Sequence, residues 1–217
     1  MEWHVTDARS LRIIDQEIGQ HTFAPAEYEI VRRVIYATAD YDYKELIQFS
    51  DQALPSGAAA LAARTTVIVD GPMAQAGITP RLQDTFANPV YCATDAITRP
   101  QKDQSKAAWG IETLAKRYPE AIFVIGHSQP ALDSLVQLIE TDIIRPSLVI
   151  ATPAGFLEAE VTKSRLKDSL MPSICIGGRK GSTVVAVAIV NGLIDLAWKA
   201  YGGKQRNMVG KGASSTV

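Results

Sequence analysis

Short runs of apolar, mostly β-branched residues alternate along the chain with longer stretches of helical periodicity. Such runs are typical of strands that are covered on both faces, because a strand with one wet face would alternate with polar residues. The predicted strands are Thr66–Val69, Val90–Cys92, Ile122–Ile125, Leu148–Ile150 and Ile174–Ile176.

The stretches between and before these runs repeat their apolar residues every three or four positions, which predicts helices. Pro25 suits the first position of the second helix, where its missing N–H has no cost. The predicted helices are Ser10–Gly19, Ala26–Ala37, Glu45–Phe49, Ser56–Ala63, Gln104–Arg117, Ala131–Glu140 and Val184–Tyr201. Alternating strands and helices favour a single α/β domain with a mostly parallel central sheet flanked by helices, preceded by an N-terminal helical segment.

The chain length of 217 residues fits one domain. We expect this domain over residues 1–203 and a flexible tail over 204–217, which is rich in Gly, Ser and Lys. A net charge of −1 gives no general field for nucleic acid. Apolar runs such as Val184–Val190 are far shorter than a membrane span, and we expect no signal peptide at the N-terminus. Cys92 and Cys175 lie in apolar runs, so we expect both to be buried free thiols. These features favour a cytoplasmic protein.

Four loops follow predicted strands and are candidate ligand sites, because ligands bind beyond the carboxyl ends of parallel strands. They are Asp70–Pro72, Gly126–Gln129, Thr152–Phe156 and Gly177–Ser182. The last loop lacks the Gly-Lys-Ser/Thr order of a phosphate-binding loop, and no strand-linked G-x-G-x-x-G is present, so a nucleotide-binding protein is not supported. Arg179 and Lys180 in this loop fit an anion site and a solvated turn equally well.

Two further side chains are candidates for acid chemistry. His127 lies between a predicted strand and helix, which suits a ligand contact or an acid–base group, although a lone loop histidine more often has neither role. Tyr36 lies one helical turn after Arg33, so both can face the same place, although a tyrosine on a helix is more often a packing residue.

Several runs together resemble the precorrin-8 methylmutase family of corrin biosynthesis. Arg33–Asp42 is similar to the family signature R-V-I-H-T-T-A-D-F-D, and Gly178–Asn191 resembles G-R-K-G-G-S-N-V-A-A-A-I-V-N. Thr152–Phe156 resembles V-P-V-G-F, and Met73–Ile78 resembles M-A-L-S-G-I. The matches occur in the family's order, so their combination is specific where each alone is weak.

The resemblance implies a homodimeric isomerase that moves a methyl group from C-11 to C-12 of the small-molecule corrin precursor precorrin-8, or its cobalt form. It implies no cofactor, and the residues show no metal-ligand spacing, so we expect no metal site. Ser10 and Arg33 correspond to family contacts to the tetrapyrrole. The predicted substrate-binding residues from the signature runs are Thr38, Arg179, Lys180 and Ser182 in addition to these two.

The chain departs from the family at the histidine that is taken as proton donor and acceptor, because Tyr36 stands there. The reaction needs a group that protonates, or donates a hydrogen bond to, a ring nitrogen. A phenol with a pKa near ~10 is a weaker acid than histidine, and we expect the positive charge of Arg33 to lower that pKa. Tyr36 is therefore the predicted catalytic residue, with His127, which stands where the family has asparagine, as a weaker second candidate.

Another departure is Gln104, where the family has an arginine. Its loss predicts altered contacts to ring carboxylates. The alternative to an isomerase is a non-catalytic corrinoid-binding protein that keeps the pocket and has lost the acid with the histidine. Binding without turnover distinguishes this alternative from the enzyme.

Overall fold

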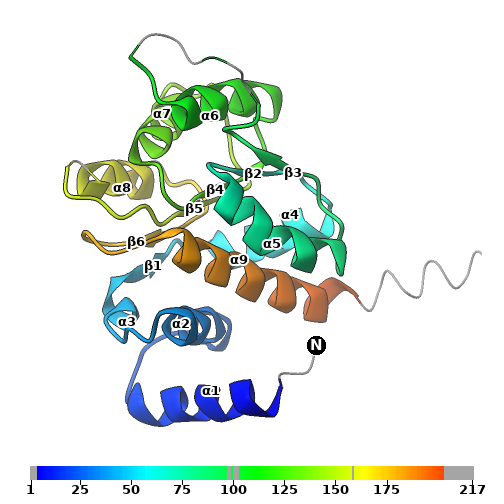
Figure 1. Ribbon diagram of the computed structural model, residues 1–217, viewed down its shortest axis with the longest axis vertical. Coiled ribbons are helices and arrows are strands. Elements are labelled where there is room, and N and C mark those ends of the chain that lie inside the picture. Colours follow the sequence, from blue (N-terminus) through cyan, green and yellow to red (C-terminus); the bar gives the residue numbers. More distant parts are fainter. Residues whose placement is uncertain (1–3, 97–98, 100–102, 158, 203–217) are drawn as a thin grey trace, which may run out of the picture.

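A six-stranded sheet forms the centre of the fold (Figure 1). The computed structural model describes residues 4–96, 99, 103–157 and 159–202. The strands are β1 (Ile47–Phe49), β2 (Val67–Val69), β3 (Val90–Cys92), β4 (Ile122–Ile125), β5 (Leu148–Ala151) and β6 (Ser173–Ile176). Their spatial order is β1-β6-β5-β4-β2-β3, and all neighbours are parallel except β1 and β6. The predicted α/β domain with a mostly parallel sheet is confirmed.

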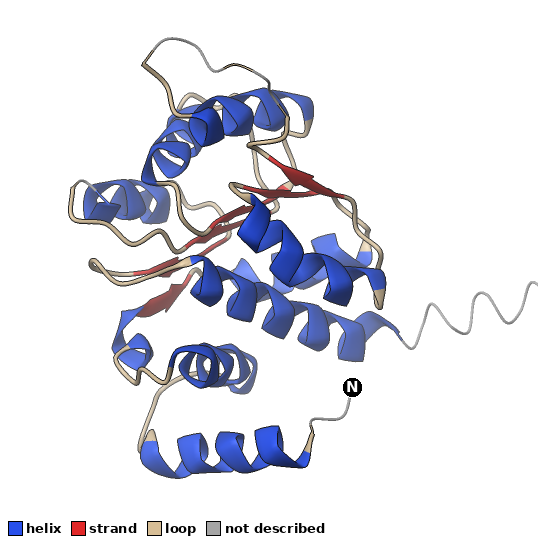
Figure 2. Cartoon of the chain, viewed as in Figure 1, coloured by secondary structure: helices blue, strands red, loops and turns tan. Residues whose placement is uncertain are grey.

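The described helices flank this sheet and precede it (Figure 2). They are α1 (Val5–Glu17), α2 (Pro25–Thr38), α3 (Tyr43–Leu46), α4 (Ala53–Ala62), α5 (Pro72–Gln83), α6 (Lys106–Arg117), α7 (Gln129–Glu140), α8 (Ala159–Asp168), α9 (Thr183–Ala197) and the π-helical turn η1 (Trp198–Gly202). The predicted tail over 204–217 lies outside the described residues.

The strands carry two hydrophobic cores because successive side chains of a strand point to opposite faces. In β4, Ile122 and Val124 belong to the core formed with α2, α4, α5 and α9. Phe123 and Ile125 belong to the core formed with α6, α7 and α8. Burying each such side chain stabilises the fold by about 1.5–3 kcal/mol, which explains the continuously apolar strand sequences.

The predicted helix over Glu45–Phe49 is wrong. Helix α3 ends at Leu46, and β1 follows it as the antiparallel edge strand, with Ile47 opposite Ile176. Pairing with β6 decides the conformation of these residues, and such a long-range partner has no local signal.

Helices α5 and α8 had no sequence prediction. Helix α5 contains both Gly77 and Pro80, which weaken a helical pattern, and α8 is largely polar. Helix α1 begins at Val5 rather than Ser10, since the His4 ring accepts a hydrogen bond from the Thr6 N–H at 3.3 Å. Ser10 therefore lies in the middle of this helix.

Helix α1 is the outermost layer on its side of the molecule and packs against α2 (Figure 1). Its buried side chains are Leu11 and Ile14. Helix α2 in turn packs on α9, which lies against the sheet. The order of layers on this side is thus α1, α2, α9 and sheet.

The helical segment Thr183–Gly202 is long and apolar enough to cross a membrane by length and composition alone, with a mean hydropathy of 1.5. The expectation that no segment has this length was therefore too strict. Half of its most apolar window is buried, and it packs against α2, α4 and α5. Burial between these helices explains its composition, so it is weak support for a membrane span.

Gly110 lets α6 approach the residue that follows β3. A Cβ added at Gly110 would lie 2.0 Å from the backbone oxygen of Ala93. We expect Gly110→Ala to lower the free energy of unfolding by about 1–3 kcal/mol, as measured by urea denaturation. Gly71→Ala is the control, because nothing lies within 4 Å of its added Cβ. Equal midpoints for the two variants would contradict this packing.

Candidate functional site

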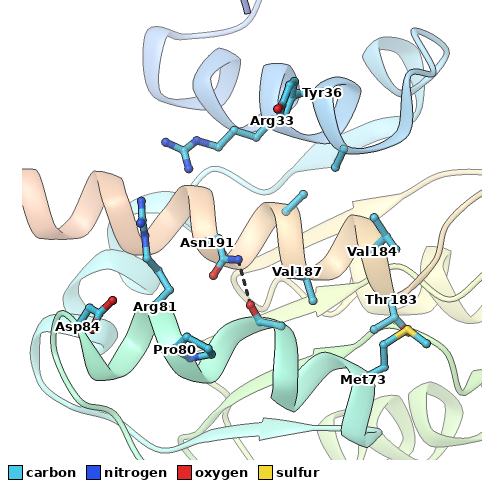
Figure 3. A pocket seen from close by; sticks show the side chains of 13 residues that line it. Arg33, Tyr36, Met73, Pro80, Arg81, Asp84, Thr183, Val184, Val187 and Asn191 are labelled. Atoms are coloured by element: carbon cyan, nitrogen blue, oxygen red, sulfur yellow. Dashed lines mark hydrogen bonds between the residues drawn. The ribbon is translucent and has the colours of Figure 1, made fainter. Parts of the chain in front are cut away.

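A pocket of about 630 Å³ lies between α2, α5 and α9 (Figure 3). Its walls are largely apolar, and the charged side chains of Arg33, Arg81 and Asp84 lie toward one end. The residues that line it are Arg33, Tyr36 and Ala37 from α2, Met73, Gly77, Pro80 and Arg81 from α5 with Asp84 after it, and Thr183, Val184, Val187, Ala188 and Asn191 from α9.

Close contact between α5 and α9 forms the floor of the pocket. The Asn191 side-chain amide donates a hydrogen bond to the Gly77 carbonyl at 3.2 Å. A Cβ at Gly77 would lie 2.6 Å from the Val187 side chain, so glycine allows the two helices to approach. The floor is therefore held by side chains of α9 packed directly on α5 rather than by a flexible loop.

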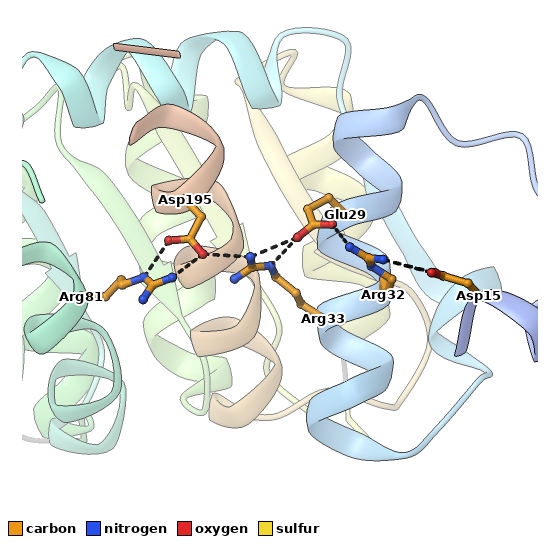
Figure 4. Close-up of polar contacts among 6 residues, drawn as sticks. All are labelled: Asp15, Glu29, Arg32, Arg33, Arg81 and Asp195. Carbon is orange, nitrogen blue, oxygen red and sulfur yellow. Dashed lines mark hydrogen bonds and ion pairs between the residues drawn. The ribbon is translucent and has the colours of Figure 1, made fainter. Parts of the chain in front are cut away.

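A chain of ion pairs crosses the polar end of the pocket (Figure 4). The Arg33 guanidinium is bound by the Glu29 carboxylate at 3.0 Å and by the Asp195 carboxylate at 2.8 Å. Arg81 Nε donates to the other Asp195 oxygen at 2.7 Å. Arg33 is only 7% exposed, so its charge needs these partners.

The same chain continues outward to α1. Arg32 binds Glu29 and also Asp15, the latter at 3.1 Å. The six side chains of the chain alternate in sign from Asp15 to Arg81, and their formal charges sum to zero. The ion pairs thus connect α1, α2, α5 and α9 without adding net charge to the pocket.

The Tyr36 hydroxyl donates a hydrogen bond to Asp7 Oδ1 at 2.7 Å. This bond to Asp7, followed by partial burial and the Asp7 charge, raises the pKa of Tyr36 above its ordinary value. The expectation that Arg33 lowers this pKa is therefore wrong. The physical reason is that Glu29 and Asp195 neutralise Arg33, whereas the Asp7 carboxylate bonds the phenol directly.

Ser10 and Tyr36 face a second hollow, of about 360 Å³, between α1 and the end of α2. The Ser10 hydroxyl donates to the Thr6 carbonyl at 3.1 Å. The structure thus brings these two predicted site residues together. Tyr36 lines both this hollow and the larger pocket.

The Gly-rich loop after β6 carries a lysine that is held by two carboxylates. Lys180 Nζ lies 2.6 Å from Asp40 Oδ2 and 2.6 Å from Asp42 Oδ2. These bonds raise the pKa of Lys180, and Lys180 in turn lowers the pKa of Asp40. Lys180 therefore fastens the loop to the segment after α2.

Its neighbour Arg179 has a different environment. The Arg179 guanidinium lies over the Phe156 ring, 5.6 Å from its centroid, and both side chains are exposed. Within the part of the chain that the structure describes, no carboxylate pairs with Arg179. Arg179 is thus a cation of the loop that is available to an anion.

Ser182 and Thr38 occupy structural positions at helix ends. The Ser182 hydroxyl caps α9 by accepting from the Val185 N–H at 3.4 Å. The Thr38 hydroxyl donates to the Val34 carbonyl at 2.8 Å at the end of α2. Neither side chain lines the pocket.

His127 is not brought together with Tyr36. Its side chain is exposed and does not line the pocket. The buried Asp70 carboxylate accepts hydrogen bonds from the backbone N–H groups of His127 and Ser128, both at 2.7 Å. Asp70, which was expected in a candidate ligand loop, therefore holds the backbone of the neighbouring loop instead. Among the described residues, no three His, Cys, Asp or Glu side chains gather as a metal site.

Comparison with known proteins identifies the family. The sequence model of precorrin-8X methylmutases matches residues 6–196. A cobalt-precorrin-8 methylmutase of Synechocystis is 36% identical over 86% of this chain and 92% of its own length. The chain belongs to the precorrin-8X methylmutase family.

Two other methylmutases extend the comparison. The crystal structure of a precorrin-8X methylmutase from Thermus thermophilus superposes with a TM-score of 0.82 at 34% identity, covering 91% of this chain and 99% of the other. A precorrin-8X methylmutase of Pseudomonas aeruginosa is 31% identical over 78% of this chain and 84% of its own length. The resemblance found in the sequence is thus confirmed.

The methylmutase signature runs meet in the fold although they are far apart in the sequence. The run over 33–42 supplies Arg33 and Tyr36 to the pocket, the run over 73–78 supplies Met73 and Gly77, and the run over 178–191 supplies α9 residues including Asn191. The fourth run joins the Gly-rich loop, since the Gly155 N–H donates to the Arg179 carbonyl at 3.2 Å.

Sequence reasoning missed Asp7, Arg81 and Asp195. Asp7 lies one turn before Ser10, so the helical pattern would have revealed it had the helix been started at Val5. Arg81 and Asp195 are 114 residues apart, and no local pattern indicates that they pair.

We expect Asp195→Asn to destabilise the methylmutase by about 3–5 kcal/mol, because the substitution removes the buried carboxylate that neutralises Arg33 and Arg81. Urea denaturation measures the effect. Asp142→Asn is the matched control, since its ion pair with Arg145 is exposed and screened by water, so that it contributes little to stability. If both variants lost a similar free energy of unfolding, the buried ion pairs of Asp195 would not be important for stability.

Proposed function

We propose that this methylmutase moves a methyl group from C-11 to C-12 of precorrin-8 or cobalt-precorrin-8, with the Tyr36 hydroxyl as the group that assists the shift. The reaction is an isomerisation: the bond from C-11 to the methyl carbon breaks, the bond from C-12 forms, and no atom is gained or lost. An isomerase is favoured over a non-catalytic corrinoid-binding protein, because the family model and the relative that match most of the chain are both named methylmutases.

The observation that supports this proposal best is the convergence of three signature runs on one pocket with Tyr36 in its wall. A corrin precursor is a broad apolar ring with charged carboxylate side chains. Apolar walls from α5 and α9 suit the ring face, and a volume of about 630 Å³ is in the ordinary range of small-molecule sites. The family membership indicates the substrate class, and the lining of this pocket supports it as the binding site.

Tyr36 acts in this proposal as a neutral phenol. Since its pKa is raised, it stays protonated at neutral pH and can donate a hydrogen bond to a ring nitrogen or lend its proton during the shift. Withdrawing electron density from the conjugated ring favours migration of the methyl group. The proton then returns to the same oxygen, so the enzyme is unchanged.

The positive residues of the signature runs have separate tasks. Arg33 and Lys180 are each bound by two carboxylates, so they hold the walls and the loop in place. Arg179 is the cation that we propose to bind a ring carboxylate, with the Phe156 ring beside it. Ser10 supports the substrate from the α1 side of Tyr36.

We expect Tyr36→Phe to lower turnover by about 10²–10⁴-fold, because phenylalanine keeps the ring and removes the donor. Conversion of both substrates is followed by absorbance under anaerobic conditions. Tyr36→His restores the residue of the family signature and should retain turnover.

Tyr28→Phe is the matched control. Its hydroxyl also donates to an α1 carboxylate, Asp15, at 2.6 Å, but it lines neither hollow. Unchanged turnover in Tyr36→Phe would overturn the role of Tyr36. Loss of turnover in His127→Asn alone would transfer the acid role to His127.

A homodimer, as the resemblance to the family implies, completes the proposal, and the cytoplasmic location is the one expected from the sequence. Light scattering on the purified protein should give about twice the chain mass of 23.5 kDa. A mass equal to one chain at micromolar concentration would contradict the dimer.

A further inference from the structure

Helix α1 is joined to the segment that carries the signature by three hydrogen bonds of one kind. In each, a tyrosine hydroxyl donates to a carboxylate of α1. The pairs are Tyr28 with Asp15 at 2.6 Å, Tyr36 with Asp7 at 2.7 Å and Tyr41 with Glu17 at 2.6 Å. One of these three tyrosines, Tyr36, lines the pocket between α2, α5 and α9.

Asp7 and Ser10 lie three residues apart on α1 and therefore on the same face of the helix. This face lies beside Tyr36, because Asp7 bonds the Tyr36 hydroxyl and Ser10 lines the second hollow together with Tyr36. The docked helix α1 thus presents both a carboxylate and a hydroxyl to the signature tyrosine. The family signature itself does not include Asp7.

Building on the proposed function, we propose that Asp7 is the positioning residue of Tyr36, which holds the phenol at the pocket wall and keeps it neutral until the substrate takes over its hydrogen bond.

The chemistry of the pair follows from the single hydrogen of a phenol. Tyr36 donates that hydrogen to Asp7, and it must turn to donate to a substrate nitrogen. Asp7 is only partly buried, so water can satisfy its carboxylate when the phenol turns away. The exchange therefore needs no second protein donor.

Charged groups around Tyr36 come from every neighbouring element. Helix α1 contributes Asp7, which bonds Tyr36, and Glu17, which lines the second hollow. Arg33 of α2, Arg81 of α5 and the following Asp84 line the larger pocket with Tyr36. Asp195 of α9 and Glu29 neutralise the two arginines, and the Tyr41 hydroxyl binds Glu17. The carboxylate that bonds Tyr36 directly is Asp7, so its charge should dominate the ionisation of the phenol.

The test compares Asp7→Asn with Asp15→Asn, since the Asp15 carboxylate accepts from Tyr28 and lines neither hollow. Both remove one α1 carboxylate that accepts from a tyrosine and leave a neutral acceptor of the same shape. We expect Asp7→Asn to lower kcat by up to about 100-fold with little change in KM. The alkaline limit of activity should move to lower pH, because a phenol without an adjacent negative charge ionises more easily. Asp15→Asn should leave both unchanged, and Asp7→Glu should restore the wild-type pH limit.

A second measurement needs no substrate. Tyrosinate absorbance is titrated for the wild type, Tyr36→Phe and Asp7→Asn, and the difference from Tyr36→Phe isolates the ionisation of Tyr36. We expect this ionisation at lower pH in Asp7→Asn than in the wild type. An unchanged titration and pH limit in Asp7→Asn would overturn the role of Asp7, even if Tyr36→Phe is inactive and the proposed function stands. A shifted titration with a fully active Tyr36→Phe would instead overturn the proposed role of Tyr36 and, with it, this role of Asp7.

Discussion

The buried charge of Arg33 constrains the whole site. A guanidinium that is almost excluded from water must be paired, and Glu29 from its own helix and Asp195 from α9 meet this requirement. Asp195 in turn binds Arg81 on α5. The helices that these ion pairs connect are the same three that form the walls of the pocket. Stability and site geometry therefore depend on one set of contacts.

This pairing also decides the chemistry. Because the charges of Arg33 and Arg81 are neutralised, the pocket does not offer a strong positive field to a phenol in its wall. The direct hydrogen bond to Asp7 has the larger effect on Tyr36 and favours the protonated form. A tyrosine in place of the family histidine thus fits a mechanism of hydrogen-bond donation better than one of full proton transfer.

The sheet and most helices could be predicted because their signals are local. Runs such as Ile122–Ile125 need burial on both faces, and this need is visible in the residues themselves. Strand β1 could not be predicted, since Ile47 is extended only because Ile176 pairs with it. Motif matching found Tyr36 and Arg33, but their partners Asp7 and Asp195 depend on how distant helices pack. For this reason the raised pKa of Tyr36 could not be predicted from local sequence patterns.

The identity of the reaction is tested most directly by following the methyl group itself. Precorrin-8 labelled with ¹³C in the C-11 methyl group is incubated anaerobically with the purified protein, and the label is followed by NMR. We expect the C-11 methyl resonance to disappear and a C-12 methyl resonance to replace it. Tight binding with the label still on C-11, for both precorrin-8 and its cobalt form, would contradict the isomerase.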